Sequence, residues 1–480
     1  MKLSLFKIKH LYLFVGSLLL LYVVHRALNI RITYDEAWTL ESFVRLNFMD
    51  IINYSPPDAN NHIINTLLIK FLYFFNDQSL FLARLPNILA FGLYIFYAYK
   101  ITSKYLSKFL GFGCFLLLLT NPFVLDFFSL ARGYGLALGF QMTSLYFIIK
   151  YFYSLELKDA IKSTSIGSLA VLSNFSFLNF WLVSVLVLFL IVYQSRERVN
   201  FKRFSLYSIL SIIILGLILY EPIRKLKIGG NLYYGGDHFY NDTLVSLAKY
   251  SMYDQTADSL TFVILNSFIG LFLVVLIVSF YKKIRFSQKS IFVLLLLGCI
   301  FSLVAQNILF DTLYLIDRTA LLFYPLIILT LVFSIDELKR IIFSRVTISI
   351  CTIVFVFNFL SNANFYKTAT WYFDAHTYQI LNDLNKEAES RNKTIHLDFS
   401  WPFQSALNYY VKNKDFSFIK VVKPKHDREA ISEKADIYIY LNNSLEKVGY
   451  NKENQVVNSK SKAIIKEYPK EHIILYKLEF

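Results

Sequence analysis

The sequence predicts an α-helical polytopic membrane protein of about eleven spans with a small extracytoplasmic α/β domain at its C-terminal end. Of the 480 residues, 56% are hydrophobic and only 17% are charged, whereas soluble domains carry roughly 25% charged residues. Apolar runs of about 18 residues recur along the chain, and a charged segment of mixed sign follows the last run. These observations exclude a soluble enzyme, a disordered chain and a disulfide scaffold.

The charge distribution predicts a domain boundary near residue 361. Residues 362–480 hold 18 of the 49 basic and 15 of the 34 acidic residues, so this segment is highly charged but nearly neutral. We therefore expect a membrane domain over 1–361 and a soluble domain over 362–480, which is long enough for a core of its own. Strands are expected at 394–397, 436–441 and 473–478, and helices at 378–389 and 403–411.

Apolar runs predict the spans of the membrane domain. The first follows three lysines and is expected to be an uncleaved helix, because no small-x-small cleavage site precedes His25 and Arg26. A cleaved signal peptide is the alternative. The expected spans are 11–29, 79–99, 109–128, 133–153, 164–178, 179–194, 204–220, 259–281, 290–310, 319–335 and 345–361.

Lysine and arginine residues predict the orientation in the plasma (inner) membrane. With the N-terminus inside, the short inner segments hold 20 of the 31 basic residues of 1–361, and such residues gather on the cytoplasmic side. An odd number of spans then places the C-terminal domain outside the cytoplasm. The net charge of +15 thus reports topology, and no nucleic-acid partner is expected. Long outer loops at 30–78 and 221–258 indicate that the chemistry takes place at the outer face.

Two adjacent carboxylates, Asp35 and Glu36, follow the first span. Neighbouring residues on a helix do not share a face, so one of them could face an internal pocket. A carboxylate at the membrane boundary is costly unless it is hydrated, paired or used. A catalytic base and a helix-capping acid are the two alternatives.

A histidine and three arginines lie at the same outer level. His62 begins an apolar stretch, and Arg84 begins the second span. Arg132 lies with Tyr134 in the short link between the third and fourth spans. A planar guanidinium suits a lipid phosphate. The alternatives are a structural histidine, an arginine that snorkels to the interface and, for Arg132, an ion pair with a nearby acid.

Arg318 begins the tenth span directly after Asp317. A cation in the first turn of a helix gains nothing from the helix dipole, which favours a bound anion beside Arg318. Asp317 could cap the helix, and it could also pair with Arg318. Asp126 is the nearby acid that could pair with Arg132.

The second long outer loop is a candidate acceptor site or lid. Lys225 precedes two glycine pairs, and Tyr233 and Tyr234 could stack on sugar rings. A disordered loop with incidental tyrosines is the alternative. Asp237 and His238 could ligate a divalent cation, although two adjacent ligands are a weak signal. No other cofactor is expected.

Carboxylates and cations at one membrane face suit the transfer of a group from a lipid phosphate. The carboxylate would deprotonate the acceptor, and the cations would hold the departing phosphate. A transporter or flippase of lipid-linked glycans is an alternative, as is a glycan polymerase. A transporter would place its ionisable residues at the bilayer midplane, whereas these residues gather at the outer edge.

These residues resemble the GT-C glycosyltransferases, in the branch of the protein O-mannosyltransferases and the lipid A aminoarabinose transferases. The resemblance covers roughly residues 20–350. The motifs that carry it are Asp35-Glu36, Asn61-His62-Ile-Ile-Asn-Thr-Leu-Leu, Arg84-Leu-Pro86, Ala131-Arg132-Gly-Tyr134-Gly-Leu and Asp317-Arg318-Thr-Ala-Leu-Leu-Phe-Tyr-Pro325.

The resemblance implies a polyprenyl-phosphate sugar donor, an extracytoplasmic acceptor and an active site at the outer face. It assigns the catalytic base to Asp35, and direct displacement by one base implies inversion at the anomeric carbon. The sequence departs from the family in two places. Pro56 and Pro57 precede His62, where the family often has prolines after its histidine, and Thr319 stands where tyrosine is common.

Overall fold

The computed structural model forms two compact units. The first comprises residues 1–27 and 46–363, and the second comprises 28–45 and 364–480. The segment 28–45 therefore groups with the C-terminal residues, which the sequence did not indicate, and the proposed boundary at residue 361 stays a prediction. The structure describes all residues except 1, 196–197, 254–261, 264, 271, 274–276, 278–287, 339–340, 414–415, 423–430, 443–456, 458–459 and 479–480.

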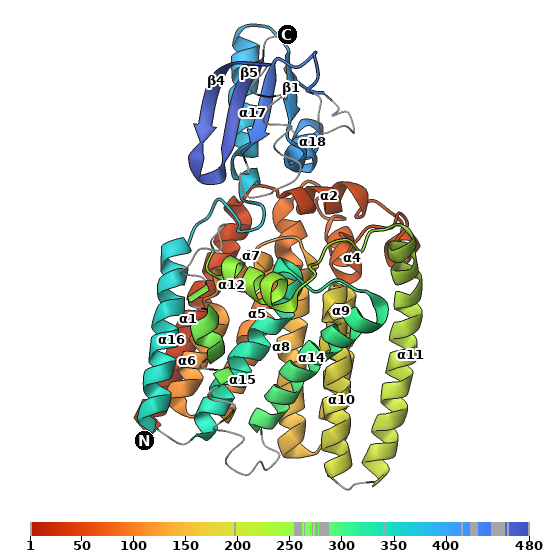
Figure 1. Cartoon of the computed structure of the whole chain (residues 1–480), viewed down its shortest axis with the longest axis vertical. Helices are drawn as coiled ribbons and strands as arrows, with labels where there is room; N and C mark the ends of the chain where they lie inside the picture. The colour runs from red at the N-terminus through yellow and green to blue at the C-terminus, as the bar shows by residue number, and fades with distance from the viewer. Residues whose placement is uncertain are drawn as a thin grey trace. The chain divides into compact units, whose positions relative to one another are not determined.

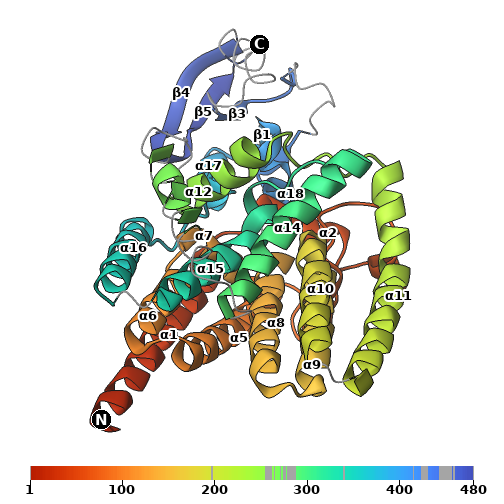
Figure 2. The ribbon, with the colours of Figure 1, turned by 60° about the horizontal axis from the view of Figure 1, so that its bottom comes forward.

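Long helices of the first unit run side by side as a bundle (Figures 1 and 2). Short helices and 3-10 or π turns join them at one end. The helices are α1 (Lys2–Asn29), α3 (Phe48–Ile52), α4 (Ile63–Leu72), α5 (Leu80–Tyr105), α6 (Lys108–Leu119), α7 (Pro122–Phe128), α8 (Gly133–Ser154), α9 (Leu157–Ser173), η1 (Phe175–Phe177), α10 (Leu178–Gln194), α11 (Arg198–Ile228), η2 (Phe239–Leu244), α12 (Val245–Ser251), α14 (Gln288–Phe310), η3 (Asp317–Leu322), α15 (Phe323–Glu337) and α16 (Ile341–Asn362).

Seven helices in the described part of the chain are long and apolar enough to cross a membrane, or eight if α6 and α7 form one bent span. The multi-pass membrane fold is thus confirmed, although eleven spans were expected. The run 259–281 lies mostly outside the described residues. The other two expected runs fall on α8 and α9, and α9 has only 17 residues.

Helix α8 is less apolar than a lipid-facing span because protein surrounds it. Sixteen of its 22 residues are buried, among them Gln141, Thr143 and Ser144. It packs against α5 and α9, and also contacts α4, α7, α10 and α14. A helix shielded by its neighbours can keep polar side chains that are hydrogen-bonded within the protein. The Gln141 amide, for example, donates to the Leu322 carbonyl at 2.9 Å.

A sharp bend of 62° separates α6 from α7. Asn121 makes the break, because its side-chain oxygen accepts from the backbone amides of Phe123 at 2.9 Å and Val124 at 3.2 Å. Pro122 occupies the first helical position, where its missing N–H costs nothing. The bend brings α7 against α8, and the chain enters the Arg132 segment directly after α7.

The second unit is a five-stranded mixed sheet with helices, as the sequence predicts. The strand order is β2-β1-β3-β5-β4, with β1 parallel to β2 and β3, and β5 antiparallel to β3 and β4. The elements are α2 (Tyr34–Ser42), η4 (Tyr372–His376), α17 (Thr377–Ser390), β1 (Ile395–Phe399), η5 (Trp401–Phe403), α18 (Gln404–Asn413), β2 (Ile419–Val421), β3 (Ile437–Leu441), β4 (Ser461–Tyr468), η6 (Pro469–Glu471) and β5 (Ile473–Leu478).

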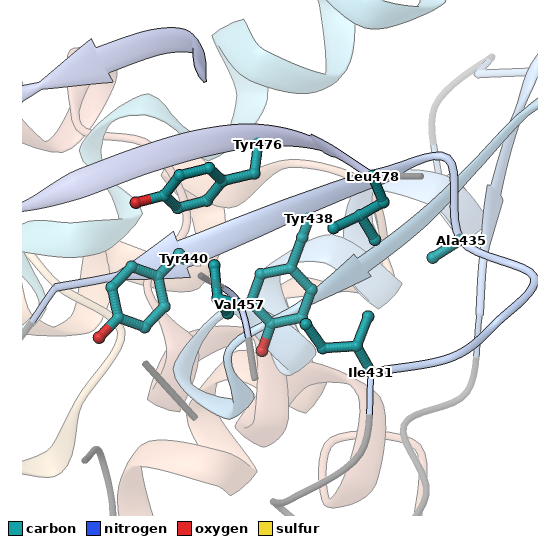
Figure 3. Close-up of a cluster of buried hydrophobic side chains, with 7 residues drawn as sticks. All are labelled: Ile431, Ala435, Tyr438, Tyr440, Val457, Tyr476 and Leu478. Atoms are coloured by element: carbon teal, nitrogen blue, oxygen red, sulfur yellow. The ribbon is translucent and has the colours of Figure 1, made fainter. Parts of the chain in front are cut away.

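One face of this sheet has its own hydrophobic core (Figure 3). Tyr438 and Tyr440 are two residues apart on β3, so their side chains lie on the same face of the sheet. They pack in one cluster with Tyr476 and Leu478 of β5. Helices α17 and α18 pack near β1 and β2. The five expected elements are confirmed, while β2 and β4 were missed.

Candidate functional site

Two helix N-termini meet in the first unit. His62 is the N-cap of α4 and Arg132 is the N-cap of α8. They approach closely because Gly133 has no side chain: an added Cβ would lie 2.8 Å from the His62 Cβ and 2.0 Å from the Ser173 carbonyl oxygen. The free backbone amides and dipoles of helix N-termini favour a negative ligand.

Gly133→Ala is therefore expected to destabilise the first unit by about 1–3 kcal/mol, because the methyl group overlaps fixed backbone. Gly92 of α5 is the matched control, since an added Cβ there meets nothing within 4 Å. Gly92→Ala should be neutral or stabilise by up to about 1 kcal/mol. Thermal unfolding of both variants in detergent checks this, and equal stabilities would contradict the packing argument.

Buried asparagines hold the backbone around Arg132. The Asn65 side chain donates to the Ala131 carbonyl at 3.1 Å, and its oxygen accepts from Asn87 at 2.9 Å. Asn87 in turn accepts from the Leu136 amide at 2.8 Å. Both asparagines are fully buried, so each of these bonds replaces a costly desolvated group. Neither asparagine was predicted from the sequence, although a lone polar residue inside an apolar run is a visible signal.

The segment before His62 is also fixed. The Asn61 amide donates to the Ile51 carbonyl at 2.8 Å, and its oxygen accepts from Thr66 at 3.0 Å. The Tyr54 hydroxyl donates to the Asn61 carbonyl. Arg132 Nη1 donates to the Asn60 carbonyl at 3.2 Å, which joins the two segments. Polar groups of residues 51–66 therefore support the histidine and the arginine.

His62 lies among cations and is buried, with 5% of its surface exposed. Burial, followed by the positive charges of Arg132 and Arg318, holds the pKa of the imidazole well below its usual 6.5. The ring is therefore neutral at pH 7, and it meets the Tyr134 ring edge-on with centroids 5.3 Å apart. Its Nε2 atom is buried with no hydrogen-bond partner in the part of the chain that the structure describes.

The depressed pKa of His62 predicts a pH-dependent stability. Below pH 6.5, His62 is protonated in the unfolded chain but stays neutral in the folded protein. The free energy of unfolding therefore falls as the pH falls. The largest slope is about 1.4 kcal/mol per pH unit. We expect His62→Asn to flatten the decline in melting temperature between about pH 7.5 and about pH 5.5. The exposed His238 provides the control, because His238→Asn should keep the wild-type slope. Equal slopes in all three proteins would contradict this account.

Arg318 and Tyr234 bring the second outer loop to the start of η3. The Arg318 guanidinium lies over the Tyr234 ring at 4.2 Å, and its Nη1 donates to the hydroxyl at 2.7 Å. That hydroxyl donates to Asp317 at 2.8 Å, so Tyr234 bridges the two charged residues. The loop is anchored further by paired backbone hydrogen bonds between Gly236 and Tyr314, at 3.0 and 2.8 Å.

Asp317 is not the N-cap that the sequence suggested. The cap position is Ile316, whose amide donates to the Thr319 hydroxyl at 2.8 Å. Asp317 has a φ of +48°, a left-handed conformation that a non-glycine residue adopts only when its surroundings enforce it. The Asp317 carboxylate accepts a hydrogen bond from the Tyr234 hydroxyl and does not cap the helix.

The remaining loop candidates differ in setting. The Lys225 ammonium group donates to the Asn53 carbonyl at 2.9 Å and to the Ser55 hydroxyl at 2.6 Å, so it ties α11 to the first outer loop. Tyr233 is 75% exposed. His238 is exposed, and its backbone amide donates to Asp242 at 2.8 Å. Among the described residues, no three His, Cys, Asp or Glu side chains group as metal ligands.

Two buried arginines support α1. Arg84 Nη1 donates to the Ala27 carbonyl at 2.9 Å, and the side chain is fully buried rather than snorkelling. Asp126, which the sequence offered as a partner for Arg132, forms a buried ion pair with Arg26. The Tyr253 hydroxyl also donates to Asp126, at 2.9 Å. Arg26 was not singled out by the sequence analysis.

Asp35 and Glu36 lie in the first turn of α2, in the second unit. The Glu36 carboxylate accepts from the Thr33 amide at 3.1 Å and from its hydroxyl at 3.2 Å, which forms a capping box. Glu36 is thus the capping acid of the pair. It caps the helix from the protein interior rather than from solvent, because it is fully buried. Asp35 is 8% exposed, and its assignment as the base stays a prediction.

Comparison with solved structures identifies the fold. The crystal structure of ArnT from Cupriavidus metallidurans in the apo state matches with a TM-score of 0.53 and 9% identity, over 97% of each chain. The same protein bound to undecaprenyl phosphate matches equally, with 10% identity. An Archaeoglobus fulgidus oligosaccharyltransferase matches 96% of this chain and 73% of its own, with a TM-score of 0.49 and 11% identity. No protein-family model and no curated protein sequence matches.

At 9–10% identity the likeness to ArnT shows the fold alone. The chain thus shares the fold of ArnT, one of the lipid A aminoarabinose transferases, which is the fold that the sequence resemblance predicts. The chain is thus an integral, multi-pass membrane protein of this fold with a small C-terminal sheet.

Proposed function

We propose that the chain is a membrane glycosyltransferase that moves a sugar from a polyprenyl-phosphate carrier to an acceptor outside the cytoplasm. The observation that carries the proposal is the close approach of the N-termini of α4 and α8, which places His62 beside the Arg132 segment, while Arg318 of η3 adds a second positive charge that acts on His62. Two guanidinium groups and two helix N-termini provide the positive field that a phosphate needs. The GT-C fold and the undecaprenyl phosphate bound to ArnT support the same donor class.

In this proposal the arginines bind the phosphate and stabilise it as it leaves. Arg132 is 2% exposed and supported by the Asn60 carbonyl, so it is held in place before the donor arrives. A charge that develops in a buried, preorganised site is stabilised more than in water. Arg318 acts from η3, where the ring and hydroxyl of Tyr234 restrict its guanidinium. Arg84, which is buried and donates to the Ala27 carbonyl of α1, is assigned to the donor site as well.

His62 and Tyr134 complete the donor site. The unpartnered Nε2 of His62 would donate a hydrogen bond to a phosphate or sugar oxygen, which satisfies a buried polar group. A neutral imidazole can donate one hydrogen bond while the arginines supply the charge. Tyr134 fixes the imidazole plane through their edge contact.

Asp35 is assigned the role of general base. Its carboxylate takes the proton of an acceptor hydroxyl, and the oxygen of that hydroxyl forms a bond to the anomeric carbon. The bond between that carbon and the phosphate oxygen breaks, and its electron pair leaves with polyprenyl phosphate. One displacement inverts the anomeric configuration, and the phosphate needs no general acid because it leaves as a stable anion.

The loop from Lys225 to His238 is assigned to the acceptor side or to a lid. Lys225 anchors its start and Tyr234 anchors its end, while Tyr233 between them is exposed and free to stack on a sugar ring. A divalent cation is not required by this scheme, because the arginines carry the charge stabilisation.

The proposed orientation has a direct test. A reporter that is active only outside the cytoplasm should be active when fused after Phe480, because the basic residues assign the C-terminal domain to that side. A cytoplasmic reporter that is active at the same position would reverse the orientation and with it the proposed active-site face.

The glycosyl transfer itself is tested in two steps. Purified protein should be stabilised against heat by undecaprenyl phosphate, and this shift should shrink in Arg132→Ala. Glycan analysis of a gene deletion then names the missing sugar, and the corresponding polyprenyl-phosphate sugar is supplied to the purified protein with an acceptor. Release of polyprenyl phosphate with formation of an inverted glycoside is expected. No binding of the lipid phosphate and unchanged glycans in the deletion would contradict the proposal.

A further inference from the structure

Residues far apart in the chain hold both ends of α2 in the second unit. Before its first turn, the Ile32 amide donates to the Tyr410 hydroxyl at 3.1 Å. At its other end, Glu41 forms an ion pair with Lys412 and accepts from the Asn413 amide at 3.1 Å. Helix α2 and α18 pack together between these points, so the helix that carries Asp35 is built into the C-terminal unit.

Asp374 of η4 holds the first residue of α2. Its Oδ2 accepts from the Tyr34 amide at 2.6 Å, although the two residues are 340 positions apart. The first amides of a helix have no partner within the helix. The local capping box satisfies the Thr33 amide through Glu36, and Asp374 satisfies the Tyr34 amide.

The surroundings of Asp374 favour a neutral carboxylic acid. The residue is 1% exposed, and its Oδ1 is buried with no hydrogen-bond partner among the residues that the structure describes. Burial raises the pKa of this carboxyl group well above its usual 3.8, and the charges of Asp35 and Glu36 raise it further. The hydrogen bond from the Tyr34 amide opposes these effects. On η6, the nearby Glu471 is paired with His376 at 3.2 Å and with Lys367 at 3.6 Å.

We propose that Asp374 is a positioning residue for the transfer reaction, and that it sets the orientation of Asp35 by fixing the first backbone amide of α2. This inference rests on the proposed function, in which Asp35 is the base. It also gives the C-terminal unit a specific role, which is to support the candidate catalytic helix. A neutral acid does this without placing another negative charge beside Asp35.

Two substitutions separate the hydrogen bond from the charge. Asp374→Ala removes the acceptor and should lower turnover about ten- to a hundredfold through misplacement of Asp35, with the KM for the donor within about twofold. Asp374→Asn keeps a neutral acceptor of the same shape, so it should retain about half of the turnover or more, with an unchanged pH–rate profile. Asp383→Asn is the matched control, because Asp383 is an exposed carboxylate of the same unit, paired with Lys466 at 3.2 Å.

Hydrogen exchange of full-length protein tests the positioning without any assay of transfer. Amides at the start of α2 should exchange about tenfold faster or more in Asp374→Ala, which corresponds to the loss of about 1.4 kcal/mol of local stability. Asp374→Asn and Asp383→Asn should exchange as the wild type does. If Asp374→Ala does not fold, Asp374→Glu displaces the acceptor by one methylene and should show the same two changes.

The outcomes distinguish the two hypotheses. Wild-type turnover and exchange in Asp374→Ala would overturn the positioning role, as would an equal loss of turnover in Asp374→Asn and Asp374→Ala. A third outcome is that α2 exchanges faster in Asp374→Ala while the wild-type protein transfers no sugar. That outcome would contradict the proposed function and confirm that Asp374 stabilises the start of α2.

Discussion

Asp35→Asn should lower turnover by about 10² or more while the protein still folds, because an amide cannot take the proton of an acceptor hydroxyl. The shape of the side chain is retained, and the hydrogen bonds that Asp374 and Glu36 make with the backbone of this turn do not involve residue 35. The measurement is single-turnover transfer by purified variant and wild-type protein, alongside their melting temperatures. Near-normal turnover in folded Asp35→Asn protein would remove this residue from the role of base.

Glu36 is the matched control for Asp35. It is the next carboxylate in the sequence, but its role is to cap the helix. Glutamine also serves at this position of a capping box, so Glu36→Gln should keep both stability and turnover. Glu36→Ala should cost about 1 kcal/mol of stability without a comparable loss of turnover in the folded fraction. A hundredfold loss in Glu36→Gln with normal folding would transfer the role of base from Asp35 to Glu36.

Arg132→Ala and Arg318→Ala should each weaken donor use about ten- to a hundredfold, since a hydrogen bond to a charged group contributes about 1.5–3 kcal/mol. The loss should be larger for Arg132, which is 2% exposed, than for the partly exposed Arg318. Lysine should restore only part of the loss, because a point charge lacks the planar fork that binds two phosphate oxygens. The measurement is the dependence of transfer on donor concentration.

Arg224 is the control for these arginines. It is paired with Glu221 at 2.7 Å and its side chain is 46% exposed, so Arg224→Ala should leave donor dependence unchanged. Melting temperatures of all three variants separate binding from folding. Unchanged donor dependence together with lowered stability in Arg132→Ala and Arg318→Ala would assign both arginines a purely structural role.

The sequence predicted the elements whose signal is local. Long apolar runs located most of the helices, and alternation located β1, β3 and β5. Strand β4 was missed because all 8 of its residues are exposed or half-buried, so it has no buried apolar face to give period-two contrast. The short β2 has three residues, which is below the length that a pattern can identify.

Parts of the candidate site could be predicted because their residues stand out from their surroundings. His62, Arg132 and Arg318 are polar residues at the ends of apolar runs, and the charges of the two arginines help to lower the pKa of His62. Asp374 could not be predicted, since its role depends on a contact 340 residues away. The same holds for Arg26 and Asp126, which are 100 residues apart.

The inclusion of residues 28–45 in the C-terminal unit determines when α2 can be completed during synthesis. The Tyr34 amide emerges from the ribosome early, whereas its acceptor Asp374 follows 340 residues later. At about 5–20 residues per second, this interval is roughly 20–70 s. During this interval, Tyr410 and Lys412 have not been synthesised either, so the α2 segment also lacks its contacts with these two residues. The nascent chain thus inserts its helices before these contacts to α2 can form, and the helix that carries the candidate base is completed only when translation is nearly finished.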